Sequence, residues 1–142
     1  KQGCSFFSSF LFPLFQIRWN TSSVTTMNSM FRSAETFNQP LSVTWDTSNV
    51  IDMEGMFNAA KAFNQTLSMF DVAKVTTMRS MFYMTYKFDQ NLTLWDVSNV
   101  VDMGKMFTLA VKFDQDLSRW DVSKVTTFEQ MFQSARKFNS GT

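Results

Sequence analysis

A period of about 25 residues, within the range of known repeat proteins, constrains this chain more than any other feature of its sequence. An aromatic residue recurs once in each unit, and a Val follows it five residues later. A Met–Phe pair, a small residue and a second Phe then follow at fixed distances in most units. The recurring aromatic positions are Trp19, Trp45, Phe70, Trp95 and Trp120. Such a period is typical of repeat proteins, in which each unit buries its apolar face against its neighbours.

The repeated apolar positions predict the core. If units stack at about 4.8 Å, the spacing of paired strands, equivalent residues form columns along the axis of the stack. Burial of a Phe or Met side chain stabilises the fold by roughly 1.5–3 kcal/mol before entropy is subtracted, and the chain holds 17 Phe and 11 Met. The expected core columns contain the five aromatic positions together with Met56, Met81, Met106, Phe57, Phe82 and Phe107.

The spacing within a unit predicts two short elements. From Met53 to Phe63 the apolar residues follow at i, i+3, i+4, i+7 and i+10, which indicates one face of a short helix. Asp52, or Thr in other units, precedes this run and is a good helix N-cap residue. The segment between Leu92 and Val100 is aromatic and β-branched, which favours a strand of three to five residues. We therefore expect an α/β repeat solenoid over residues 19–142, in which each of five coils contains a short parallel strand and a short helix.

Both ends of the sequence depart from the repeat. Residues 1–18 are interpreted as a degenerate N-terminal coil or as a targeting remnant, because Phe6 and Phe12 keep the repeat register while the apolar run resembles a signal peptide that Pro13 interrupts. This run is too short to span a bilayer. No polar cap follows Phe138, so we expect further chain or another copy against that end. Contact between unlike ends does not close and produces fibres.

One stretch carries a resemblance to a known family. The string from Trp95 to Phe107 (WDVSNVVDMGKMF), followed by Phe113 and Leu117, resembles the bacterial surface protein repeat family, whose units have about this length and which is also called the mycoplasma lipoprotein domain of unknown function. That family is similar to leucine-rich repeats. The resemblance implies a leucine-rich-repeat-like coil, an extracellular or surface-attached protein, and a role in adhesion or structure. It implies no catalytic residue and no cofactor.

Composition excludes several classes of function. The chain has no His, one Cys (Cys4) and a net charge of +1, so it lacks most acid–base machinery, a soft metal site and an electrostatic surface for nucleic acid. A row of Asp residues could hold a metal, but each is followed by the residues of a turn in which Asp accepts a backbone N–H two residues later. We expect these turns, no metal and no enzyme activity. The row comprises Asp46, Asp71, Asp96 and Asp121.

A second period runs through the first. Units with S-N-V-[IV]-D-M alternate with units with [AS]-K-V-T-T, which is explained by duplication of a two-unit segment or by the separation of like charges. The alternation predicts one exposed row of Asn49, Lys74, Asn99 and Lys124. Three sequons, at Asn20, Asn64 and Asn91, are glycosylation candidates if the protein is secreted by a eukaryote, and unmodified turn residues otherwise.

These observations predict an extracellular, non-enzymatic structural or adhesive surface protein that assembles head to tail into filaments. The alternative is a binding module that recognises a protein or glycan through the exposed strand face of the coils. The position before each aromatic residue varies most and includes Leu94 and Arg119, as expected for a recognition surface. End-to-end self-association, a surface protein and a glycan are the expected partners, and neither nucleic acid nor a membrane span is expected.

Overall fold

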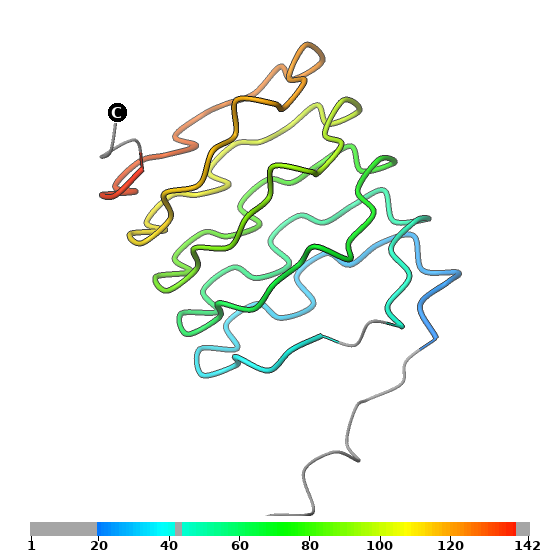
Figure 1. The fold of residues 1–142 in the computed structure, drawn as a ribbon, viewed down its shortest axis with the longest axis horizontal. Coiled ribbons are helices and arrows are strands. Elements are labelled where there is room, and N and C mark those ends of the chain that lie inside the picture. The colour runs from blue at the N-terminus through cyan, green and yellow to red at the C-terminus, as the bar shows by residue number, and fades with distance from the viewer. Residues whose placement is uncertain (1–19, 42–43, 139–142) are drawn as a thin grey trace, which may run out of the picture.

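The chain winds in stacked turns, each about one sequence repeat long. The structure is a computed structural model that describes residues 20–41 and 44–138, so Trp19 and the segment 1–18 lie outside the described residues. Successive turns lie beside one another in chain order, from blue to red in Figure 1. We call these turns coils and number them in chain order. The five coils begin at Asn20, Trp45, Phe70, Trp95 and Trp120, and the described part of the last one ends at Phe138.

The expected α/β architecture is wrong. The described residues contain no helix and no extended strand, and consist of tight turns and irregular backbone. Regular pairing is limited to isolated parallel bridges that join one residue of each coil to its equivalent in the next coil. The bridged residues are Thr26, Asp52, Thr77, Asp102 and Thr127. The protein is therefore not a solenoid of strand–helix coils, and the leucine-rich-repeat likeness is not confirmed.

The segment expected to be helical is a series of turns because its N–H groups alternate between two partners. Met56 N donates to the carbonyl oxygen of Met53 in its own coil, at 3.2 Å. Phe57 N instead donates to the carbonyl oxygen of Met81 in coil 3, at 2.9 Å. An α-helix would direct both N–H groups to carbonyls four residues earlier. Four donors per coil junction, at alternate residues, therefore take the place of helical hydrogen bonds: in coil 2 they are Met53, Gly55, Phe57 and Ala59.

This alternation requires left-handed backbone. Each described coil has two residues with φ between 54° and 61°, four positions apart. Of these residues in the described coils, Gly55 alone is a Gly. A left-handed conformation costs a non-Gly residue on the order of 1–2 kcal/mol, and the bonds between coils offset that cost. These residues are Ser29 and Ser33, Gly55 and Ala59, Ser80 and Met84, Lys105 and Leu109, and Gln130 and Ser134.

The segment expected to be a strand is also built from turns. Trp95 N donates to the carbonyl oxygen of Leu92 at 3.0 Å, and Val100 N donates to that of Val97 at 2.9 Å. Both bonds close turns of four residues. The exposed strand face on which the binding alternative relied is therefore absent from the described coils.

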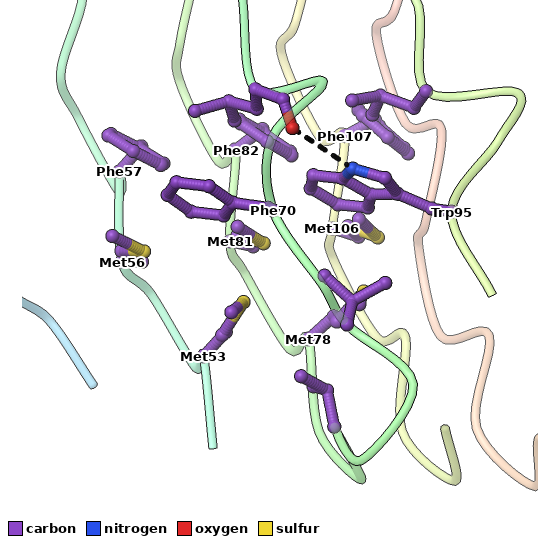
Figure 2. Close-up of a cluster of buried hydrophobic side chains, with 14 of the residues drawn as sticks. Met53, Met56, Phe57, Phe70, Met78, Met81, Phe82, Trp95, Met106 and Phe107 are labelled. Carbon is purple, nitrogen blue, oxygen red and sulfur yellow. Dashed lines mark hydrogen bonds between the residues drawn. The ribbon is translucent and has the colours of Figure 1, made fainter. Parts of the chain in front are cut away.

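The core lies inside the coils, where equivalent side chains form columns (Figure 2). Met56, Met81 and Met106 are fully buried. The Nε1 group of Trp95 donates to the carbonyl oxygen of Leu67, near the end of coil 2, at 3.3 Å, so its indole is hydrogen-bonded as well as buried. The other described members of the expected columns are also buried: Trp45, Phe70, Trp120, Phe57, Phe82 and Phe107.

Two columns of Phe rings run through the described coils. Phe57 and Phe82 have ring centroids 5.7 Å apart and 3° between their planes. Within coil 3, Phe82 also stacks on Phe88 at 4.0 Å. The separation between coils falls in the range of favourable aromatic pairs, and the pair within coil 3 is closer still. The two columns contain Phe31, Phe57, Phe82, Phe107 and Phe132, and Phe37, Phe63, Phe88, Phe113 and Phe138.

Candidate functional site

Side chains at one turn of the coils hydrogen-bond from coil to coil. The Oδ1 atom of Asn64 accepts from the backbone N–H of Asp89 and from the side-chain amide of Gln90, both at 2.9 Å. Asn38 does the same for Asn64 and Gln65. The residue after the second Phe therefore connects coils.

The Asp row forms the turns that its sequence predicts. Asp46 Oδ1 accepts from the backbone N–H of Ser48 at 2.9 Å and from its hydroxyl at 2.6 Å. The hydroxyl of Ser48 is the main cause that holds the pKa of Asp46 below its ordinary value, followed by the backbone N–H. Equivalent backbone bonds are made by Asp71, Asp96 and Asp121. Each carboxylate is thus committed to its own turn.

The alternation between units has a physical basis on an adjacent exposed row. Lys74 Nζ donates to Asn49 Oδ1 at 2.8 Å, and Lys124 Nζ donates to Asn99 Oδ1 at 2.6 Å. Each Lys therefore binds the amide of the coil before it and has no Lys as an adjacent neighbour in the row. The predicted row is confirmed.

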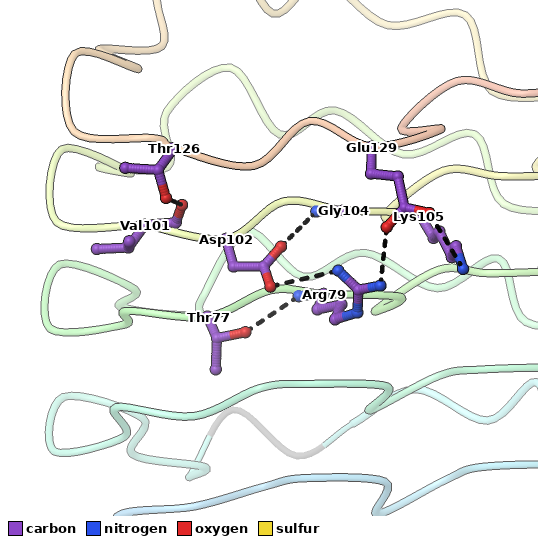
Figure 3. A network of polar contacts seen from close by, with 8 residues as sticks. All are labelled: Thr77, Arg79, Val101, Asp102, Gly104, Lys105, Thr126 and Glu129. Carbon is purple, nitrogen blue, oxygen red and sulfur yellow. Dashed lines mark hydrogen bonds and ion pairs between the residues drawn. The ribbon is translucent and has the colours of Figure 1, made fainter.

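A network of charges extends across three coils (Figure 3). Arg79 in coil 3 pairs with Asp102 in coil 4 at 3.5 Å and with Glu129 in coil 5 at 3.1 Å. Glu129 also lies 3.6 Å from Lys105. Gly104 makes room for the guanidinium, because a Cβ atom there would lie 2.5 Å from Arg79 Nη1. The sequence signal for this network is one repeat position that holds Arg79 in coil 3, Gly104 in coil 4 and Glu129 in coil 5.

The described surface has a shallow hollow of about 240 Å³ over coils 3 to 5. Thr108 lines it, and the residues at the same repeat position in the neighbouring coils, Tyr83 and Gln133, are longer and line it too. Gln130 and Ser134 also line it. No sequence motif indicates this hollow, because its outline depends on side-chain lengths in neighbouring coils and on left-handed turns.

The outward face of coil 5 exposes apolar side chains at core positions. Val122 is 39% exposed and Phe128 is 46% exposed. Their equivalents in coil 4, Val97 and Met103, are 1% and 0% exposed. This face therefore presents a cross-section of the core columns.

The three sequons lie in different environments. Asn20 and Asn91 are exposed, and each accepts the backbone N–H two residues later, from Ser22 and Thr93. Asn64 is half-buried in the bonds between coils described above. The structure therefore distinguishes two accessible sequons from one that already supports the fold. Cys4 lies outside the described residues. Among the described residues, no helix is long and apolar enough to cross a membrane.

The stacked coils and their side-chain rows define a repeat protein. The chain belongs to the family described as Mycoplasma protein of unknown function, DUF285, whose model matches twice, over residues 6–83 and 66–142. Two overlapping matches in one chain are consistent with a family that contains repeats. No curated protein and no solved structure matches the chain.

Proposed function

We propose that this chain is a non-enzymatic structural or adhesive repeat protein, extracellular or on the cell surface, that assembles end to end. The observation that supports assembly is the outward face of coil 5, where Val122 and Phe128 are exposed at positions that are buried within the stack. Exposed apolar surface of this kind marks a site at which another protein surface binds.

The backbone of the same face supports the proposal. Lys105 N and Phe107 N in coil 4 donate to carbonyl oxygens of coil 5. The equivalent N–H groups of coil 5 donate to no described residue. These groups belong to Phe128, Gln130, Phe132 and Ser134. A row of N–H groups without an acceptor among the described residues is a template for another chain.

The outward face of coil 1 is complementary. Asp52, Glu54 and Met56 accept bonds from coil 1 through their carbonyl oxygens. The equivalent carbonyls of coil 1 accept no backbone bond from any described residue. They belong to Thr26, Asn28, Met30 and Arg32. A second copy placed with its coil 1 on coil 5 would repeat the junction found within the chain.

Electron microscopy and analytical sedimentation of the purified chain test this assembly. We expect filaments whose length grows with protein concentration. The double variant Val122→Glu/Phe128→Lys should abolish them, because it places charges on the face that must become dry. The matched control is Leu94→Lys, since Leu94 is 88% exposed on the side of the stack. Monodisperse particles at every concentration, or filaments that survive the double variant, would contradict the proposal.

Surface exposure and glycosylation are tested separately. Labelling of intact producing cells with an antibody should detect the chain, and a signal only after permeabilisation would contradict surface exposure. In a host that glycosylates secreted proteins, we expect occupancy at Asn20 and Asn91 before Asn64, because Asn20 and Asn91 are exposed whereas Asn64 is half-buried in the bonds between coils. Intact-mass and peptide mass spectrometry measure this order.

A binding module is the second candidate function. The nearly fully exposed Leu94 and the hollow around Thr108 favour it, because recognition sites combine apolar contact with polar groups. A pull-down with surface-matrix proteins and glycans, repeated with Leu94→Ser and Arg119→Ser, tests the surface before the aromatic positions. Capture that both variants leave unchanged would assign binding to another part of the chain.

A further inference from the structure

We infer that the hollow over coils 3 to 5 binds a neutral sugar ring, with Tyr83 as the surface against which the ring packs. This inference rests on the second candidate function and names its ligand class. It follows from the shape of the hollow, the hydrogen-bonding groups around it and its balance of charge.

The shape follows from the repeat. Equivalent residues of neighbouring coils lie in a row, so a short side chain between two long ones leaves a depression. Thr108 lies between Tyr83 and Gln133 in such a row. Its hydroxyl donates to the carbonyl oxygen of Gln130, which turns the side chain toward the backbone and fixes the floor. A hydrogen bond to the backbone therefore fixes the side chain that forms the bottom of the hollow.

The groups around the hollow match the chemistry of a sugar. The hydroxyls of Tyr83 and Ser134 and the amides of Gln130 and Gln133 make no side-chain hydrogen bond within the described part of the chain. Hydroxyls and amides both donate and accept, as the hydroxyls of a sugar do. The face of an aromatic ring carries negative charge density and attracts the C–H groups of a sugar. Leu109 adds a second apolar side chain to the lining.

The balance of charge favours a neutral ligand. Lys105 is the cation at the hollow, and its Nζ lies 3.6 Å from the carboxylate of Glu129. Arg79 binds the same carboxylate at 3.1 Å, so Glu129, which does not line the hollow, is shared between Lys105 and Arg79. Lys105 therefore has a partner in the protein, and an acidic sugar would have to compete with Glu129 for it.

The size and openness of the hollow set the expected affinity. A depression of about 240 Å³ accommodates one ring and leaves the rest of a chain in solvent. Contacts with one small ring give a dissociation constant on the order of a millimolar. A free monosaccharide and a sugar unit of a polysaccharide or glycoprotein share this chemistry, so separate binding measurements must distinguish them.

Saturation-transfer NMR and an array of immobilised glycans test the inference on the full chain. Free neutral hexoses, free uronic acids and polysaccharides of each kind are the probes. We expect contacts from the C–H face of neutral rings and weaker signals from acidic ones. Tyr83→Ala should weaken binding at least about tenfold, while Tyr86→Ala, the same change at the other Tyr of the chain, should leave it unchanged.

A second variant fills the hollow without a new backbone requirement. Ser134 has φ 59°, and Met84 occupies the same repeat position in coil 3 with φ 56°. Ser134→Met should therefore fold and block the ring. Absence of binding to any neutral sugar, or binding that Tyr83→Ala and Ser134→Met leave intact, would overturn the inference. Capture of a protein without sugar binding would overturn it while leaving the binding-module function in place, and filament formation is measured independently.

Discussion

The hydroxyl of Thr85, fully buried in coil 3, donates a hydrogen bond of 3.0 Å to the carbonyl oxygen of Phe57 in coil 2. Coils 2 and 4 have Ala60 and Ala110 at this repeat position. Thr85, which occupies a position where these coils have Ala, thus adds a hydrogen bond between coils inside the core.

The first prediction concerns this bond. Thr85→Val keeps the shape of the side chain but removes the donor, and leaves the Phe57 oxygen with the bond from Ala60 N alone. We expect the free energy of unfolding to fall by about 1 kcal/mol, measured as a lower urea midpoint with an unchanged slope. Thr85→Ser is the control because it retains the hydroxyl. Equal midpoints for the wild type and Thr85→Val would contradict the role of the bond.

The second prediction compares two members of one core column. Met78 is fully buried in coil 3, whereas Phe128 takes its place on the outward face of coil 5. Met78→Ala should cost about 2–5 kcal/mol because it leaves a cavity between two coils. Phe128→Ala should cost much less, because little core lies above the ring. Urea unfolding of monomeric protein at low concentration measures both variants, and equal losses would show that coil 5 is covered.

The third prediction distinguishes the observed turns from a helix. Ser80 has φ 54°, a conformation that a β-branched side chain strongly disfavours. Ser80→Val should lower the free energy of unfolding by more than about 1 kcal/mol, whereas Ser80→Asn should be tolerated because Asn adopts left-handed backbone. In a helix, Ser and Val have similar propensities, so the wild type and Ser80→Val would have similar free energies of unfolding. Thermal and urea unfolding of both variants decide between these outcomes.

The fourth prediction concerns acid. Hydrogen bonds from the Ser48 hydroxyl and backbone N–H hold the pKa of Asp46 below its ordinary value of 3.8 in the folded protein. The stabilisation is therefore present above the unfolded-state pKa and is lost as the pH falls through the lower folded-state pKa. Asp46→Asn keeps an oxygen acceptor for the turn but cannot titrate. The loss of stability between about pH 5 and about pH 2 should be smaller in this variant than in the wild type, as measured by urea midpoints at each pH.

That difference should be partial. Ser98 and Ser123 lower the pKa values of Asp96 and Asp121 through the same pair of bonds. These Asp residues continue to titrate in Asp46→Asn, so the variant retains most of its acid sensitivity. An acid response identical to that of the wild type would show that the turn at Asp46 contributes nothing.

Particular residues show how far the sequence predicts this structure. The turn at Asp46 could be predicted because Asp bonds a backbone N–H only two residues away, which is a local matter. The row that holds Asn49 and Lys74 could be predicted because a repeat of constant length aligns equivalent residues, and the structure adds the hydrogen bond between them. The hollow at Thr108 could not, because its outline depends on the relative lengths of side chains one repeat apart. The reach of Arg79 to Glu129 over two coil junctions likewise depends on the space above Gly104.

The helix prediction failed for an instructive reason. Inward residues such as Met53, Phe57 and Ala60 follow at spacings of three and four, which both a helix and a chain of tight turns produce. Local propensity favours the helix, since residues such as Ala59 and Met84 avoid left-handed backbone. Hydrogen bonds to the next coil exist only when a next coil is present, so no single unit contains the information that selects the turns.

The sequence by itself determined the period and which side chains of each unit face inward, because apolar residues recur at fixed places and must leave water together. Only the tertiary structure decided the path of the backbone. A lone unit would satisfy its N–H groups within itself. In the stack, Phe57 and its equivalents donate outward to the neighbouring coil, and the bonds gained at every junction outweigh the cost of left-handed residues.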